Sequence, residues 1–343
     1  MPNSINTERQ KVLVIGLGQL GLPVAKYILD KGFDVCGYDI NNETMMHAKK
    51  KFGIKTTNCF RNFDIYVICV STHNHSDIYS PQIDGLISVI FKIASEAKNG
   101  ALVSIESTIP QGTCKKIFEL LEHRLHIVHA PHRWYSLDEK KYGVNQLRVL
   151  GGVNPCCLRL GLEFYNGNSD IKPSKIRQGE NIFLQSNNID KSNIFSEKEQ
   201  TTLFNDNFDL QYNGKLIKSR SLEIPIHVVS SIEIAELTKI IENSHRYLQI
   251  AFAEELYLYC QGNNISFSDL REALNTKWNV EILEPRDGIG GHCLPKDTRM
   301  FLNSSTIKSK ILQSAIEVDS LYRDLRSRKL KKKLITCIED LKN

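Results

Sequence analysis

The N-terminal part of the chain alternates between short apolar runs and longer segments with apolar residues at helical spacing. Strands buried on both faces of a parallel sheet are continuously apolar, as these runs are. They predict strands at residues 11–15, 33–38, 64–70, 101–106 and 125–128. The segments between them predict helices at residues 20–31, 83–96 and 113–123. This alternation predicts an α/β domain with a doubly wound parallel sheet.

The pattern changes twice in the second half of the chain. Residues 167–222 are rich in Asn, Ser, Lys and Asp and predict a polar insert, with a hairpin on the turn Asn213–Gly214. Residues 231–260 carry an unbroken helical pattern without Pro or Gly. A helix of that length typically joins two domains or lines a dimer interface. A further helix is predicted at residues 306–325, before a basic stretch at 326–333.

Composition narrows the class of protein. The chain has 343 residues, 41% hydrophobic and 24% charged, as in a globular protein of two domains. Its net charge of +5 is mild and spread along the chain, so nucleic-acid binding is not expected. The sequence shows neither a membrane span nor the apolar stretch of a signal peptide. Nine scattered cysteines do not suggest a disulfide framework. We expect a cytoplasmic protein and predict no metal site.

A glycine-rich motif predicts a dinucleotide site. Gly16–Leu17–Gly18–Gln19–Leu20–Gly21 follows the first strand and opens the first helix, which is the context of a Rossmann-like NAD-binding turn. Asp39 ends the second strand, where a carboxylate binds ribose hydroxyls and repels a 2′-phosphate. NAD is therefore favoured over NADP. Cofactor contacts are predicted for Gly16, Gly18, Gln19, Leu20, Gly21, Asp39, Val70, Ser71, Thr72, Ser107 and Thr108.

Residues 284–297 form the most specific stretch of the sequence. Gly288, Gly290 and Gly291 allow the backbone to fold closely around a ligand. Cys293 follows them, with His292 and Lys296 close in sequence, a setting that favours a reactive thiol. The alternative for any cysteine is a small buried hydrophobic residue, which is what we expect of the other eight.

Lys239 and Asn243 stand four residues apart on the long predicted helix and hence share one face. A Lys and an amide that point the same way can stabilise negative charge on a substrate oxygen. The alternative is a solvent-facing pair without a function.

Together these motifs resemble the UDP-glucose/GDP-mannose dehydrogenase family, which oxidises the C6 alcohol of a nucleotide sugar to a carboxylate with two NAD. The resemblance spans residues 11–302, broken by the polar insert. Its matching pieces are residues 16–21 with Asp39, then 106–113, 148–152, 235–255 and 290–297. It implies a mainly α-helical second domain, a homodimer formed through residues 231–260, and a role in polysaccharide biosynthesis. The expected domains are residues 1–166, the insert at 167–222, and residues 223–343.

The resemblance also implies a mechanism. Lys239 would help to remove the hydroxyl proton, directly or through water, and Cys293 would capture the aldehyde as a thiohemiacetal that is oxidised to a thioester. Asn243 and Lys239 would hold the oxyanion, and Thr108 and Asp297 would position or activate water. Predicted substrate contacts are Arg133, Lys239, Asn243, Gly288, Gly290, Gly291 and Lys296.

Three departures from the family pattern stand out. His132 replaces a family Glu and is either a base or a satisfied polar residue. Ser71–Thr72–His73–Asn74 stands where a Pro-Thr-Pro pattern is common, so local contacts are expected to differ. Members usually continue into a further nucleotide-binding domain, so we expect a short member in which a partner subunit or the insert supplies that surface, or a substrate without a nucleotide.

Two other functions remain open on the sequence. The first is a two-electron β-hydroxyacid-type dehydrogenase, which would share the Lys239–Asn243 pair but would not need Cys293. The second is a non-catalytic NAD-binding protein with a sensing or assembly role.

Overall fold

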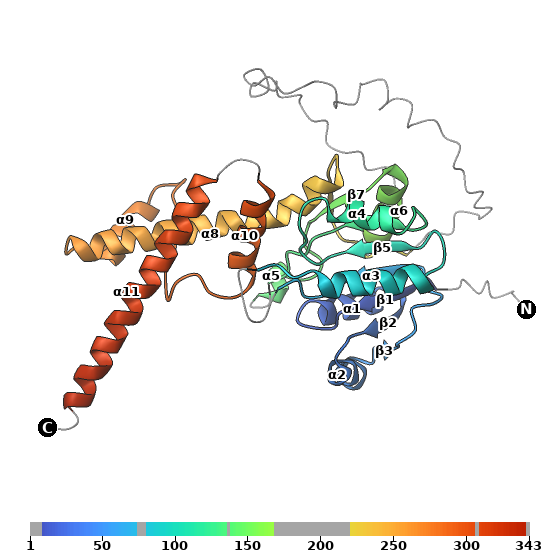
Figure 1. The fold of residues 1–343 in the computed structure, drawn as a ribbon, viewed down its shortest axis with the longest axis horizontal. Helices are drawn as coiled ribbons and strands as arrows, with labels where there is room; N and C mark the ends of the chain where they lie inside the picture. The colour runs from blue at the N-terminus through green and yellow to red at the C-terminus, as the bar shows by residue number, and fades with distance from the viewer. Residues whose placement is uncertain (1–8, 74–79, 136–137, 168–219, 306–308, 341–343) are drawn as a thin grey trace, which may run out of the picture.

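The computed structural model describes residues 9–73, 80–135, 138–167, 220–305 and 309–340. A sheet domain lies at one end of the molecule and a helical part at the other, with the long helix α8 (Ile232–Gly262) running between them (Figure 1). The strand order is β3-β2-β1-β4-β5-β6-β7-β8, with β6 and β7 antiparallel and every other pair parallel. The strands are β1 (Lys11–Ile15), β2 (Asp34–Tyr38), β3 (Lys55–Thr56), β4 (Ile65–Ile68), β5 (Leu102–Ile105), β6 (His126–His129), β7 (Arg148–Gly152) and β8 (Ile226–Val228).

Helices cover both faces of this sheet, which confirms the doubly wound prediction. Along β1, Val12 and Val14 belong to one apolar core, whereas Leu13 and Ile15 belong to the other. Successive side chains of a strand point to opposite faces, so a strand between two helical layers must be apolar throughout. The first layer contains α1 (Gly21–Asp30), α2 (Asn42–Phe52) and α6 (Pro155–Tyr165), and the second contains α3 (Asp84–Glu96) and α4 (Thr113–Leu120).

The sequence did not predict α2 or the antiparallel strand β7. Helix α2 is mostly polar, and its ends are defined by local caps. Asn41 accepts a hydrogen bond from the backbone N–H of Glu43, and Gly53 ends the helix with a φ of 67°. These caps are visible in the sequence, but the apolar stripe that usually identifies a helix is weak there.

The predicted insert lies almost wholly outside the described residues, as does its hairpin at Asn213–Gly214. The chain that flanks it is described on both sides. The Leu222 N–H donates to the Phe164 carbonyl oxygen at 2.9 Å, and the Ile224 N–H donates to that of Tyr165 at 2.8 Å. Strand β8 then pairs with β7. Residues 226–228, which the sequence assigned to the helical domain, therefore complete the sheet.

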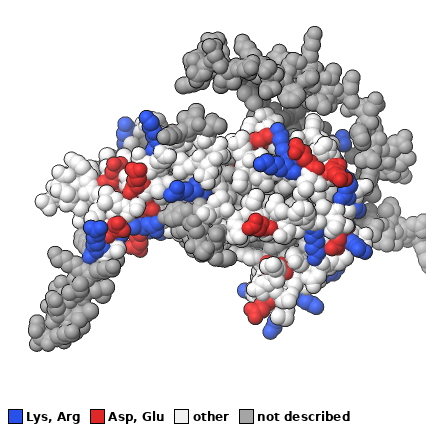
Figure 2. Space-filling model, in the orientation of Figure 1, with Lys and Arg blue, Asp and Glu red and all other residues white. Residues whose placement is uncertain are grey.

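Helices α10 (Cys293–Ser304) and α11 (Lys310–Asp340) pack against α8 in the helical part (Figure 1). Tyr247 and Ala251 of α8 share an apolar cluster with Ile289 and Ala315. Two shorter helices are α9 (Phe267–Asn275) and α5 (Glu139–Tyr142). Among the described residues, none of the helices combines the length and the apolar character needed to span a bilayer. On the face drawn in Figure 2, acidic and basic side chains are interspersed over both parts of the molecule.

Glu236 joins α8 to the sheet domain. Its side chain is fully buried, and its two carboxylate oxygens accept hydrogen bonds from Gly112 N–H at 2.6 Å and Cys114 N–H at 2.8 Å. Those donors belong to the N-terminus of α4, where backbone N–H groups lack partners within the helix. A carboxylate of α8 therefore caps a helix of the sheet domain.

We expect Glu236→Ala to destabilise the protein, because it leaves two buried N–H donors without an acceptor, at about 1–3 kcal/mol for each. Glu236→Gln keeps one acceptor oxygen and should lose less. Urea denaturation measures both free energies of unfolding. Glu119→Ala, at an exposed position of α4, is the control and should change stability by less than about 0.5 kcal/mol. Equal stability of the Glu236→Ala and Glu119→Ala variants would contradict the capping role.

His129 predicts a pH dependence of stability. Burial lowers the pKa of His129 from 6.5 to about 3, so the unfolded chain takes up the proton first as the pH falls. Its contribution to stability is complete above pH 6.5 and is lost toward pH 3, by up to about 1.4 kcal/mol for each pH unit. His129→Leu should make the free energy of unfolding correspondingly less sensitive to pH across that window. His227→Gln, at an exposed position, is the control, and identical slopes in both variants would disprove the assignment.

Candidate functional site

The three glycines of the turn between β1 and α1 have different surroundings. Gly16 has a φ of 88°, and a Cβ there would lie 2.7 Å from the Cys69 carbonyl oxygen. A Cβ on Gly21 would lie 1.7 Å from the Gly16 carbonyl oxygen. A Cβ on Gly18 would meet no atom of the described residues within 4 Å. Gly16 and Gly21 therefore pack the turn, whereas Gly18 leaves open the side from which a phosphate reaches the N-terminus of α1.

Asp39 lies beside this turn, at the end of β2. Its Oδ2 accepts a hydrogen bond from Leu17 N–H at 2.7 Å, and its Oδ1 accepts one from Asn41 N–H at 2.9 Å. Each oxygen keeps a further lone pair for a ribose hydroxyl. The strand order reverses between β1 and β4, and open α/β sheets bind their ligands at that point. The open side of Gly18 and the carboxylate of Asp39 thus fit the pyrophosphate and ribose of NAD.

The remaining predicted cofactor contacts follow β4 and β5, the next strands across the sheet. Ser107 Oγ donates a hydrogen bond to the Val70 carbonyl oxygen at 2.7 Å. Thr72 Oγ1 donates to the Thr108 carbonyl oxygen at 2.8 Å. These bonds hold the two segments together at the edge of the sheet that carries the glycine turn.

Four residues from distant parts of the chain meet in a buried group that we call the Asp297 cluster: Thr72, Asn243, Lys296 and Asp297. Lys296 Nζ lies 2.7 Å from Asp297 Oδ1 and donates to Thr72 Oγ1 at 3.1 Å. Asn243 Nδ2 donates to Asp297 Oδ2. The cluster thereby links α8, α10 and the end of β4. Both oxygens of Asp297 contact protein groups, an arrangement that positions Asn243 and Lys296.

Cys293 lies next to this cluster in the fold. It is the exposed first residue of α10 and stands three and four residues before Lys296 and Asp297, hence on the same helix face. The adjacent His292 ring stacks on His73, with ring centroids 4.4 Å apart and planes 15° apart, so the loop lies against the segment after β4.

His132 belongs to a buried polar network beneath α8. Its Nδ1 accepts a hydrogen bond from Trp134 N–H at 3.2 Å, and its Nε2 lies 3.0 Å from Arg148 Nη2. Burial, with the charges of Arg148 and Lys239, lowers the pKa of His132 well below its usual value, so the ring is neutral at pH 7. Both ring nitrogens are engaged, which favours the interpretation of His132 as a satisfied polar residue.

Glu106, Arg148 and Tyr165 complete that network, and the sequence analysis did not assign them to the site. Arg148 Nη1 donates to Glu106 Oε1 at 2.6 Å, and the Tyr165 hydroxyl donates to the same oxygen at 2.6 Å. All three side chains are buried. The signal in the sequence is a charged residue directly beside an apolar strand, as Glu106 follows Ile105 and Arg148 precedes Val149.

Several predicted substrate contacts have protein partners of their own. Arg133 forms an ion pair with Glu242 of α8 and donates to the Leu147 carbonyl oxygen at 3.2 Å. A Cβ on Gly288 would lie 2.5 Å from Arg323 Cγ, so this glycine allows α11 to approach. Gly290 and Gly291 are exposed, and a Cβ on either would meet no described atom within 4 Å. Lys239 is half-buried on α8, one turn before Asn243.

Comparisons with known proteins identify relatives of the chain. The NAD-binding domain of the UDP-glucose/GDP-mannose dehydrogenase family matches residues 42–168, and the central domain of that family matches residues 233–320. UDP-N-acetyl-D-mannosamine dehydrogenase of Methanococcus maripaludis is 25% identical over 338 residues, which are 92% of this chain and 66% of the relative. The Campylobacter jejuni protein of that name is 26% identical, over 94% of this chain and 75% of the length of that relative.

The fold is also found in a solved structure, that of the UDP-D-ManNAc dehydrogenase from Pyrococcus horikoshii. It aligns with a TM-score of 0.69 at 24% identity, over 96% of this chain and 72% of that protein. The chain thus spans about two thirds, 66%, of the length of the Methanococcus maripaludis relative.

The glycine turn predicts opposite effects for two alanine variants. Gly18→Ala places a methyl group on the open side of the turn, so it should leave thermal stability nearly unchanged and weaken NAD binding by roughly tenfold or more, about 1.4 kcal/mol. Gly21→Ala places a methyl group onto the Gly16 carbonyl oxygen and should unfold the turn. Thermal denaturation and calorimetric titration with NAD separate the two effects. Wild-type NAD affinity in the Gly18→Ala variant would place the cofactor elsewhere.

Proposed function

Because the chain belongs to the UDP-glucose/GDP-mannose dehydrogenase family, we propose that it is an NAD-dependent dehydrogenase that oxidises the C6 alcohol of a nucleotide sugar to a carboxylate. The proposed substrate is a UDP-linked N-acetylhexosamine, because its curated relatives are named UDP-N-acetyl-D-mannosamine dehydrogenase. The observation that carries the proposal is the exposed thiol of Cys293 at the N-terminus of α10, beside the Asp297 cluster. An oxidation that stopped at the aldehyde would not need this thiol.

The proposed reaction proceeds in two oxidations at one site. Bound NAD supplies the hydride acceptor for both oxidations. Lys239, directly or through water, takes the proton of the C6 hydroxyl in the first oxidation. The Cys293 thiolate then attacks the aldehyde carbon, forms a C–S bond and gives a thiohemiacetal, which the second oxidation converts to a thioester. Water attacks the thioester carbon and the C–S bond breaks. One alcohol, one water and two NAD⁺ thus give one carboxylate, two NADH and three protons.

The neighbouring residues take distinct roles in this proposal. Asn243 and Lys239 stabilise the oxyanion that forms when the thiolate adds to the aldehyde. Asp297 holds Asn243 in place, and with Thr108 it orients the water that hydrolyses the thioester. His132 has a structural role in this proposal. Its lowered pKa makes it a weak base, and its ring contacts the buried Arg148.

We also propose that two copies of the chain associate through α8, in the cytoplasm. Ile234, Ile241, Phe252 and Tyr259 are large apolar side chains of this helix that are 41–58% exposed. They follow one another at intervals of 7, 11 and 7 residues, which return to the same helix face at about 3.6 residues per turn. These four apolar side chains on one helix face are suited to packing against the same face of a second copy.

The proposed function is tested by counting NADH. Wild-type protein supplied with limiting UDP-N-acetyl-D-mannosamine should form two NADH for each sugar consumed, together with the uronate. Cys293→Ser should reduce uronate formation on the order of 10³-fold or more, since it removes the nucleophile. Absorbance of NADH and mass spectrometry of the product give both quantities.

Cys59→Ser, at another exposed cysteine, is the matched control and should behave as the wild type. One NADH per sugar would instead indicate the two-electron dehydrogenase. NAD binding without turnover on a panel of UDP-, GDP- and free sugars would indicate the non-catalytic alternative. Unchanged uronate formation in Cys293→Ser would refute the covalent mechanism.

A further inference from the structure

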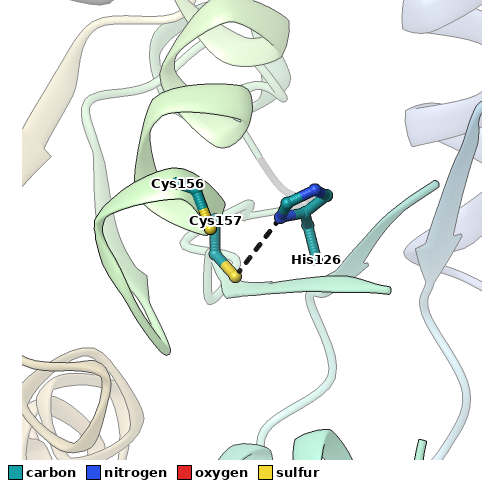
Figure 3. Close-up of side chains that lie close together, drawn as sticks. All are labelled: His126, Cys156 and Cys157. Atoms are coloured by element: carbon teal, nitrogen blue, oxygen red, sulfur yellow. Dashed lines mark hydrogen bonds between the residues drawn. The ribbon is translucent and has the colours of Figure 1, made fainter. Parts of the chain in front are cut away.

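Three side chains that suit a soft metal ion meet on the sheet domain, away from the proposed active site. His126 is the first residue of β6, and Cys156 and Cys157 lie in the first turn of α6 (Figure 3). Their ligand atoms, one imidazole nitrogen and two sulfurs, all lie within 4.8 Å of one another. Strand β7 runs antiparallel to β6, so its carboxyl end, and the helix that follows it, reach the amino end of β6. The active site lies at the opposite, carboxyl edge of the parallel strands.

We propose that His126, Cys156 and Cys157 bind one Zn²⁺ ion, with water at the fourth position. Zn–S and Zn–N bonds of about 2.3 and 2.0–2.1 Å place tetrahedral sulfur and nitrogen ligands about 3.6 Å apart. The observed distance from Cys157 Sγ to His126 Nδ1 is 3.7 Å, so this pair already has the spacing of zinc ligands. Cys156 is exposed, and its sulfur lies within 4.8 Å of both of these atoms.

The surroundings leave the ligand atoms accessible to one another. His126 is half-buried, and its Nδ1 faces Cys157 Sγ. Cys156 and Cys157 follow Pro155 in the first turn of α6. Burial raises the pKa of the Cys157 thiol, so zinc must displace its proton at a cost in affinity. Cys156 now donates to Asn154 Oδ1 at 3.0 Å, and zinc would replace that thiol proton. Asn154 also caps α6, so the backbone beneath both sulfurs is held in place.

The position of the site indicates what the metal would do. It would tie the amino end of β6 to α6, two elements of one apolar core, and would not contact Cys293 or the glycine turn. Zinc should therefore raise the melting temperature, because it binds the folded chain in preference to the unfolded one. It should not change the rate of NADH formation, because its ligands lie away from the proposed active site.

The experiment compares two exposed cysteines in the full chain. Cys293→Ser is introduced into every sample, so that the proposed nucleophile does not itself bind zinc. The protein is reduced and stripped of metal, and zinc is titrated in competition with a chromophoric chelator. The Cys59→Ser sample should bind one equivalent of zinc, and the Cys156→Ser sample should bind it at least roughly tenfold more weakly. Equal binding by the two samples, or no stoichiometric zinc in either, would overturn the proposal.

Cobalt supplies a second readout that does not depend on affinity alone. Co²⁺ added to the Cys59→Ser sample should show thiolate-to-cobalt charge-transfer absorption and the visible bands of a four-coordinate site. His126→Asn should alter the visible bands and weaken binding, while thermal denaturation without metal verifies that the variant is folded. Octahedral cobalt bands alone, without charge transfer, would refute ligation by the two thiolates.

Discussion

Lys296 and Asp297 form a buried ion pair where the helical part meets the sheet domain. Moving two charges out of water costs several kcal/mol for each ion unless other polar groups replace the lost hydration. Asn243 of α8 and Thr72 after β4 are those groups. Both reach the pair because α10 packs against α8 and contacts the segment after β4. The groups that stabilise the pair thus come from both parts of the molecule, and they hold the helix that begins at Cys293.

The same principle operates at two further points under α8. Glu236 is satisfied by backbone N–H groups of α4, and Glu106 by Arg148 and Tyr165. Each of these carboxylates is buried, and each depends on donors from other elements of the structure. Hydrogen bonds are directional, whereas apolar contacts tolerate small displacements. Glu236 therefore makes a directional polar contact between α8 and the sheet domain, whereas Glu106 joins elements within that domain.

Much of the sheet domain could be predicted from the sequence. The parallel strands are continuous apolar runs, and the glycine motif has a spacing that serves one kind of turn. The antiparallel direction of β7 could not be predicted, because it depends on pairing with β6 and leaves no local signal. Helix α2 was missed because it is short of apolar residues and depends on its caps, Asn41 and Gly53.

The sequence likewise predicted some residues of the candidate site but not their contacts with other parts of the chain. Cys293, Lys296 and Asp297 lie in one sequence motif, and helical spacing alone places them on one face. The partners of His132 could not be inferred, because Arg148 and Glu106 approach from separate strands. That packing also decides the behaviour of the imidazole, which the sequence left open between a base and a structural residue.

The hydrogen bonds that connect residues 164 and 165 with residues 222 and 224 bring the chain back to the point where it left the sheet domain. The chain therefore leaves and re-enters the sheet domain at neighbouring points. Doubling the length of such a loop costs only about 0.6 kcal/mol in closure entropy. Segments of different length can therefore join these two anchors at little cost in closure entropy.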